Sequence, residues 1–410
     1  MAFQAQKPQP LVYIRTLLQN FLFKDMVILG HLSIRHVIDD DLATVVLPCS
    51  RLLDPANDDV EAPHDARFAI AYQMELFRQR AAQSYLDIFR AFCQNRCRVR
   101  RTLCHSIQDW ETVQLDAEEI DQLLQIQMDE KPINYQTTLT STVAEPAYSL
   151  PLSSWAYLYK LRLMEWIVQL GFELETYQPD ELAGMYWYLS YLAKTRAQHA
   201  ERIKAFMLQR FSDLRAHNQL TAAMETQFAR SLAYIRATIL DAAVTWELAD
   251  ALACLYTCLA RLRLVVAPPR PYSSDELRYD IRMKPFAPIS LPEPPSYETF
   301  KRATDQPESS TTSLLDYAQR AVGGARKGYE VLTKLTEKEA FTVNAHERWV
   351  AGNKSCLKSV IAASIAISAV RRAVGAHGDE ANVWLVAEVP RPDKCYHDWW
   401  IVPKVTEKKK

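Results

Sequence analysis

The scarcity of glycine constrains this chain more than any other feature of its sequence. Only 9 of its 410 residues are glycine, roughly 2% against a usual share of about 7%. None lies between Gly30 and Gly171. Phosphate-binding loops and dinucleotide turns need residues without a Cβ, because the backbone must approach the ligand closely. The sequence therefore argues against an enzyme built on a nucleotide-binding loop.

Helical periodicity dominates the rest of the sequence. Apolar residues recur every three or four positions, the spacing that places them on one face of an α-helix. The longest such pattern covers residues 220–262, far more than an ordinary globular helix. We expect Gly171 to end one helix and Pro179 to begin the next. Further helices are predicted over residues 11–38, 64–128, 154–170, 314–335 and 346–374, and loops over residues 48–63 and 131–151.

Proline marks a change in composition after the longest predicted helix. Nine of the 21 prolines fall within residues 268–307, and proline removes a backbone donor and interrupts helices. We therefore expect an extended strap that lies over the helices. Two β-like runs, residues 383–389 and 399–405, predict a short hairpin. The predicted fold class is all-α, mainly long antiparallel helices, with a proline-rich extended strap and at most a short β-hairpin near the C-terminus.

These patterns divide the chain into four regions. The boundaries follow the polar connections and the proline-rich stretch, where helical periodicity stops. We predict an N-terminal helical region over residues 1–147, a central helical region over residues 148–264, the proline-rich strap over residues 265–312, and a C-terminal helical region with short strands over residues 313–410.

Charge and cysteine content indicate which partners and which cellular compartment suit the chain. The 48 basic and 49 acidic side chains nearly cancel, so any contact with a polyanion must come from a local patch. Eight cysteines are scattered along the chain, and its first ten residues lack the hydrophobic core of a signal peptide. This pattern predicts reduced thiols in a cytoplasmic protein. The longest strongly apolar run, residues 360–370, is too short to cross a bilayer, and we expect no membrane partner.

Residues with catalytic or metal-binding chemistry do not form a recognisable site. Cys93 and Cys97, and likewise Cys254 and Cys258, stand four positions apart, but each pair lacks the second pair that a zinc site needs. No histidine lies in a zinc-protease motif or beside a nucleophile. Residues 320–325 fit the pyrophosphate-binding pattern of GNAT-fold acetyltransferases, yet no predicted strand leads into them. We therefore predict no catalytic, cofactor-binding or metal-binding residue.

A basic cluster lies in the predicted helix over residues 64–128. Helical phase places Arg96 among apolar residues such as Leu103, where a cation must be paired with a carboxylate or face a partner. Arg98 and Arg101 point away from that apolar face. They lie either on a solvated surface or against RNA, an inositol phosphate or an acidic partner. The candidate partner or polyanion contacts are Arg96, Arg98, Arg100 and Arg101.

The densest aromatic segment lies at residues 171–189. Such density is typical of a buried helix junction or of the anchor of an interface. Glu173 and Glu175, two positions apart, would suit acid–base chemistry, but without a pocket motif they are better explained by contacts to backbone or basic groups at the junction. The residues predicted to form this structural or interface corner are Phe172, Glu173, Glu175, Tyr177, Tyr186, Trp187 and Tyr188.

Three segments together resemble a known family. They are Asn95-Arg96-x-Arg98-x-Arg100 with the helix over residues 110–121, Gly171-Phe172-Glu173-Leu174-Glu175-x-Tyr177 with Tyr186-Trp187-Tyr188-Leu189, and Leu277-Arg278-Tyr279-x-x-Arg282-x-x-Pro285-Phe286 with Pro294-Pro295-x-Tyr297-x-x-Phe300. In this order they resemble the large auxiliary subunit of the N-terminal acetyltransferase C complex, NatC. The resemblance covers roughly three quarters of the chain and matches the C-terminal part of the family.

The resemblance implies a mostly helical, non-catalytic scaffold. It implies that the scaffold holds a GNAT-fold catalytic subunit, which binds acetyl-CoA, and a small Sm-like subunit. Such a complex resembles a ribosome-associated, cytoplasmic enzyme that acetylates the initiator Met when a bulky hydrophobic residue follows, without membrane or DNA partners. On the strap, the matching residues are Arg278, Tyr279, Arg282 and Phe286.

Two other functional classes compete with this interpretation. The chain could be an enzyme in its own right, in which case the isolated chain would bind acetyl-CoA. It could also be a helical-repeat adaptor of an unrelated cytosolic complex, in which case no acetyltransferase would co-purify with it.

Overall fold

We describe the protein from a computed structural model. The structure describes residues 96–123, 152–218, 220, 222–266, 274–334, 343–378 and 384–408, together with some residues between 76 and 87. The helix predicted over residues 11–38 and the loops predicted over residues 48–63 and 131–151 lie outside the described residues.

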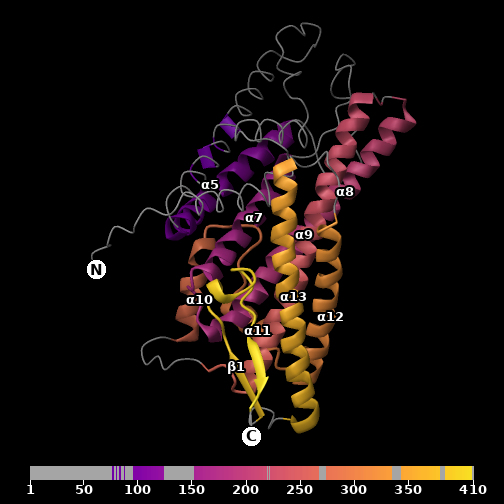
Figure 1. Ribbon diagram of the computed structural model, residues 1–410. Coiled ribbons are helices and arrows are strands. Elements are labelled where there is room, and N and C mark those ends of the chain that lie inside the picture. Colours follow the sequence, from indigo (N-terminus) through magenta and orange to yellow (C-terminus); the bar gives the residue numbers. More distant parts are fainter. Residues whose placement is uncertain are drawn as a thin grey trace. The chain divides into compact units, whose positions relative to one another are not determined.

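Long helices make up most of the described chain (Figure 1), which confirms the all-α prediction. The helices predicted over residues 220–262, 314–335 and 346–374 lie within about three residues of α9, α12 and α13. In chain order the helices are α5 (Arg96–Leu123), α7 (Leu152–Glu173), α8 (Leu182–Ala216), α9 (Ala222–Arg261), α10 (Asp275–Met283), α11 (Tyr297–Asp305), α12 (Thr311–Leu332) and α13 (Val343–His377).

Contacts divide the chain into two compact units. Unit 1 comprises Met1–Lys160, Gln198–Ile239 and Glu337–His346, and unit 2 comprises Leu161–Ala197, Leu240–Thr336 and Glu347–Lys410. Three of these boundaries fall inside α7, α8 and α9, where no change in composition marks them. The division into four regions, drawn from composition, stays a prediction.

Unit 1 has an aromatic core between α5 and the start of α7. The indole Nε1 of Trp110 donates a hydrogen bond to the carbonyl of Ala156 (2.7 Å). The same ring packs against Trp155 and Tyr159, with centroids 5.8 and 5.9 Å away. Burial follows helical spacing along α5, since Leu103, Ile107, Trp110, Val113 and Ala117 are all buried.

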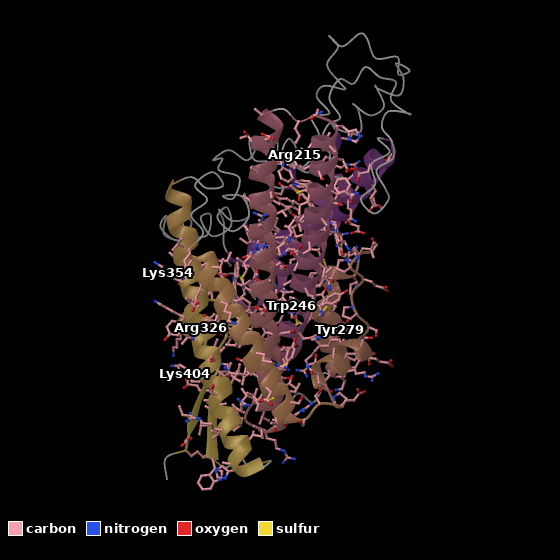
Figure 2. All side chains as sticks on the ribbon, turned by 90° about the vertical axis from the view of Figure 1, so that its right-hand side faces the viewer. Arg215, Trp246, Tyr279, Arg326, Lys354 and Lys404 are labelled. Carbon is pink, nitrogen blue, oxygen red and sulfur yellow. The ribbon has the colours of Figure 1, made fainter. Side chains whose placement is uncertain are left out.

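In unit 2, α12 and α13 lie side by side (Figures 1 and 2). The side-chain amide of Gln319 donates a hydrogen bond to the hydroxyl of Ser364 (3.2 Å), and Arg371 pairs with Asp316 (2.7 Å). Helix α12 also approaches α9 closely, because a Cβ at Gly328 would lie 2.2 Å from the side chain of Val244. Small residues on α12 therefore permit close helix packing in this unit.

A buried network of charges joins helices of unit 2. Arg196 of α8 donates hydrogen bonds to Glu165 of α7 (2.6 Å) and to Asp241 of α9 (2.9 Å), and Arg162 also binds Glu165 (2.5 Å). Burial acts to lower the pKa of Arg196, but the charges of Glu165 and Asp241 outweigh it, so the pKa is raised. Removing any one member would strand a buried charge.

Two sequence predictions need correction. Helix α7 continues past Gly171 to Glu173, and the chain turns at Glu175, whose φ is 53°. The proline-rich strap is not extended throughout, because it contains α10 and α11, each nine residues long. Prolines interrupt the strap only outside these helices, and the hydroxyl groups of Ser274 and Ser296 accept hydrogen bonds from the first turns. The serine caps thus stabilise the first turns of α10 and α11, two helices that the proline content of the strap did not predict.

The predicted hairpin is present near the C-terminus. Strands β1 (Leu385–Glu388) and β2 (Lys404–Glu407) pair antiparallel, with Leu385 opposite Glu407. The second strand begins later than residue 399, the predicted start, because residues 399–402 pack against other parts of unit 2 instead.

Two helices among the described residues are long and apolar enough to cross a membrane by length and composition alone. They span Ile235–Arg261 and Val350–His377. In the first, 78% of the apolar window is buried inside the protein, and in the second 39%. Because core helices of soluble proteins pass the same test, length and composition here are weak evidence for a membrane span.

Candidate functional site

The candidate site is the aromatic corner, residues 171–189, where α7 ends and α8 begins. The ring of Phe172 stacks on Tyr186 with centroids 4.2 Å apart, and it meets the edge of Tyr177 at 5.0 Å. A Cβ at Gly171 would lie 2.1 Å from the hydroxyl oxygen of Tyr177. The glycine is therefore required by the packing of Tyr177 and not by the end of the helix.

Most aromatic side chains of the corner are enclosed within unit 2. The ring of Trp187 lies 5.6 Å from Phe300 of α11, and Tyr188 packs against Phe286 at 5.3 Å. A Cβ at Gly184 would lie 2.3 Å from the ring of Phe300, so α11 rests directly on the backbone of α8. Phe172, Tyr177, Tyr186 and Tyr188 are buried, and Trp187 is half-buried.

Two arginines of α10 tie the strap to the corner. Arg278 pairs with Asp180 (2.6 Å), and Arg282 binds Glu181 through Nε and Nη2 at 2.9 and 3.0 Å. The guanidinium of Arg282 also lies over the ring of Tyr177, 5.6 Å from its centroid. Burial acts to lower the pKa of Arg282, but the hydrogen bond and charge of Glu181 raise it overall. Both arginines are thus held in place by carboxylates of the corner.

Tyr279 anchors the same helix through its ring and its hydroxyl. The ring packs against Phe300 at 4.8 Å and Tyr297 at 5.6 Å, and the hydroxyl donates a hydrogen bond to the carbonyl of Pro295. Phe286, the last of the four strap residues singled out by sequence, is fully buried. All four, Arg278, Tyr279, Arg282 and Phe286, therefore hold the strap against the corner.

The C-terminal segment, residues 384–408, covers another side of the corner. The hydroxyl of Tyr186 donates to the carbonyl of Trp399 (3.0 Å) and accepts from the amide of Ile401 (2.7 Å). The indole of Trp399 donates to Glu173 (3.2 Å), and Arg391 pairs with Glu175 (3.4 Å). The two glutamates thus contact an indole and a guanidinium, and only Glu175 meets the basic group that the sequence predicted. Their role in place of acid–base chemistry stays a prediction.

The basic cluster lies at the start of α5 in unit 1. Arg98 and Arg101 are exposed and Arg100 is half-buried, while Val99 and Leu103 are buried. The helical phase predicted from the sequence is therefore correct for these residues. The side chain of Arg96 lies outside the described residues, and its predicted ion pair stays a prediction, as does contact of the cluster with a polyanion.

The other chemical candidates lie inside packed helices. Residues 320–325 are in the interior of α12, where the carboxylate of Glu247 lies against Gly324, so no strand leads into a phosphate-binding turn there. Cys254 and Cys258 are buried, and burial raises the pKa of each thiol to about 12. Within the described residues, no group of three histidine, cysteine or acidic side chains is arranged to hold a metal ion. Cys93 lies outside the described residues.

Sequence reasoning missed the residues that close the corner. Asp180 and Glu181 follow Pro179 at the predicted start of a helix and were not among the predicted site residues, yet they bind the two strap arginines. Trp399 and Trp400 were assigned to a strand, yet Trp400 is fully buried and its ring lies parallel to Tyr186 with centroids 6.1 Å apart. Adjacent tryptophans in a short terminal run were the available signal, because rings of that size are seldom left exposed.

The sequence of the chain matches a protein-family model over nearly its whole length. A sequence model described as "NAA35-like, TPR repeats" matches residues 1–401. The chain belongs to the NAA35-like family. The aromatic corner and the basic cluster of this NAA35-like chain both lie within the matched residues.

Curated relatives of this NAA35-like chain are named as NatC auxiliary subunits. The chain is similar to N-alpha-acetyltransferase 35, NatC auxiliary subunit, of Homo sapiens, with 24% identity over 308 residues that cover 72% of this chain and 39% of that protein. The corresponding protein of Saccharomyces cerevisiae is 22% identical over 247 residues, 55% of this chain and 30% of its own length. The chain thus spans about two fifths of the length of the first curated relatives that it matches.

Solved structures show the same fold. The chain superimposes on a chain of the crystal structure of the NatC complex bound to CoA with a TM-score of 0.62 and 16% identity, over 82% of this chain and 48% of that one. The apo NatC complex gives a TM-score of 0.61. At this identity the likeness establishes the fold alone.

Proposed function

We propose that this chain acts as a non-catalytic auxiliary subunit, a scaffold, of a NatC-type N-terminal acetyltransferase. The observation that carries the proposal is the match of the NAA35-like family to residues 1–401, supported by the names of the curated relatives. The corner is consistent with a structural role, because strap, helices and C-terminal segment fill it with their own side chains.

The finer role follows from the resemblance found in the sequence. In this proposal a GNAT-fold partner binds acetyl-CoA and transfers the acetyl group to an initiator Met followed by a bulky hydrophobic residue. A small Sm-like subunit completes the complex, which works in the cytoplasm at the ribosome, without membrane or DNA partners. The chain itself needs no cofactor, and its helices serve to position the other subunits.

Reconstitution tests the proposal. The full chain is purified alone and together with a GNAT-fold NatC catalytic subunit and the Sm-like subunit, and acetyl transfer to a Met-Leu peptide is measured. We expect the three proteins to co-purify, the complex to be active, and the chain alone to give only the buffer rate. Failure of the acetyltransferase to co-purify would favour the unrelated adaptor, and activity of the chain alone that Gly323→Trp abolishes would make it an enzyme.

The carboxylates of the corner supply a second readout. A catalytic acid or base contributes about 10² to 10⁴ in rate, whereas Glu173 and Glu175 contact Trp399 and Arg391. Glu173→Gln and Glu175→Gln should therefore leave the turnover of assembled complex within a few-fold. A hundred-fold loss in complex that gel filtration shows to be intact would place the corner in the active site.

A further inference from the structure

The outer face of α13 carries a regular stripe that stays exposed among the residues that the structure describes. Lys354, Lys358, Ile361, Ile365 and Arg372 follow one another at spacings of four, three, four and seven residues. At about 100° per residue these positions fall within about 60° of one another on the helix. All five side chains are exposed, Ile361 by 44% and Ile365 by 65%.

The opposite face of the same helix already serves the core of unit 2. Cys356, Val360, Ala363, Ile367 and Val370 have at most 1% of their surface exposed. The two outer isoleucines are thus not needed to bury α13. β-Branched residues are also slightly unfavourable in an exposed helix, because they lose χ1 freedom there. Neither packing nor helix propensity explains their presence.

Along the stripe on α13, all charged residues are basic. Residues 348–377 contain no aspartate or glutamate. The neighbouring helix α12 adds exposed Arg320, Arg326 and Lys327, and exposed Lys334 follows its end, while its described carboxylates, Asp316 and Glu330, pair with Arg371 and Arg326. Figure 2 shows Lys354 on the outer side of α13, with Arg326 and Lys404 on the same side of unit 2.

We propose that this outer face of α13 docks an acidic amphipathic helix of a partner protein. Ile361 and Ile365, four residues apart, are the apolar centre of the stripe. Packed helix pairs meet through apolar residues at three- and four-residue spacing, and the occupant would cover the two isoleucines with apolar residues at that spacing. Lys354, Lys358 and Arg372 lie at both ends of the two isoleucines, where they would pair with glutamates or aspartates that flank the seam of the occupant.

The spacing also sets the size of the occupant. From Lys354 to Arg372 the stripe rises over 18 residues, which at about 1.5 Å each is roughly 27 Å, or five turns. A nucleic acid would be held by the basic residues alone and gives no reason for exposed isoleucines between them. The proposal rests on the proposed function in one respect, that the chain works by binding protein partners.

Site-specific crosslinking tests this docking. Ile365 in the full chain is replaced by the photoreactive residue p-benzoylphenylalanine, the cells are irradiated, and the crosslinked residues are identified by mass spectrometry. A matched control carries the same residue at Val331 of α12, which is also apolar and exposed. We expect position 365 to crosslink to a protein segment of net negative charge with apolar residues at three- and four-residue spacing, and position 331 not to.

Charge reversal checks the chemistry of that contact. Lys354→Glu with Lys358→Glu should reduce the crosslink at least ten-fold without lowering the melting temperature, because both side chains are exposed. Acid-to-lysine changes in the captured segment should restore it. Crosslinks to RNA, to lipid, to a second copy or to residues 1–75 of the same chain overturn the proposal, as does the same segment captured from position 331 or no crosslink at all.

The outcomes separate this proposal from the proposed function. Co-purification of the acetyltransferase is measured on the same preparations. If the acetyltransferase co-purifies while position 365 captures no acidic helix, the scaffold proposal stands and the docking proposal fails. If position 365 captures an acidic helix and no acetyltransferase co-purifies, the reverse holds.

Discussion

Replacing Gly171 by alanine should destabilise the protein, although glycine inside a helix is usually the worse choice. Gly171 lies within α7, where alanine normally gains about 0.5–1 kcal/mol. Here the added Cβ would lie 2.1 Å from the hydroxyl oxygen of Tyr177 and 2.2 Å from its Cζ. Removing that overlap requires a shift of more than about 1 Å in a buried ring, and overpacking of this kind costs about 1–3 kcal/mol. The loss exceeds the gain, and we expect the free energy of unfolding to fall by about 1–2 kcal/mol.

The same substitution elsewhere in the chain provides the control. A Cβ at Gly323, inside α12, meets no atom within 4 Å, so Gly323→Ala should raise stability by about 0.5–1 kcal/mol. Urea denaturation of both variants, followed by circular dichroism at 222 nm, should move the two midpoints in opposite directions. Tyr177→Phe should not rescue Gly171→Ala, because Cζ remains. If Gly171→Ala raises the midpoint as Gly323→Ala does, Tyr177 does not pack on α7.

Three further predictions concern other contacts of unit 2. Arg196→Met should lower the free energy of unfolding by about 3–5 kcal/mol, because it strands buried carboxylates, and urea titration measures this loss. A double-mutant cycle with Arg282→Gln and Glu181→Gln should give a coupling of about 0.5–3 kcal/mol; additive effects would contradict the bidentate pair. Burial and the charge of Asp280 raise the pKa of Tyr279 to about 12, above its value of about 10 in the unfolded chain. The stability that the neutral phenol contributes is therefore fully present below about pH 10 and is lost as the pH rises toward 12. Over that range the urea midpoint of Tyr279→Phe should fall less steeply than the midpoint of the unchanged protein.

Local patterns predicted the elements that local physics determines. The bounds of α9, α12 and α13 followed from apolar spacing, because a helix in contact with a core must repeat its apolar residues every three or four positions. The same rule placed Arg98 and Arg101 outward on α5. It failed at Gly171, where the deciding contact comes from Tyr177, six residues beyond the glycine and past the turn.

Contacts between distant segments could not be predicted in the same way. The aromatic density of residues 171–189 indicated a buried corner, but not what buries it. Arg282 and Glu181 are 101 positions apart, and Tyr186 and Ile401 are 215 apart. Many arginines and glutamates in this sequence could have paired, and only the folded backbone selects among them.

The buried hydrogen bonds of the corner depend on contacts between segments that are far apart in the sequence. The amide of Ile401 donates to the hydroxyl of Tyr186 (2.7 Å), and the carbonyl of Ile401 accepts from the hydroxyl of Tyr256 (2.8 Å). Both tyrosines are buried, and burial raises the pKa of each phenol well above its usual range. An unpaired polar group at such depth costs about 1–3 kcal/mol. The hydroxyl groups of α8 and α9 and the backbone of the C-terminal segment therefore satisfy one another's hydrogen bonds. The corner is therefore complete only with the segment through residue 401, and its packing depends on segments more than two hundred residues apart.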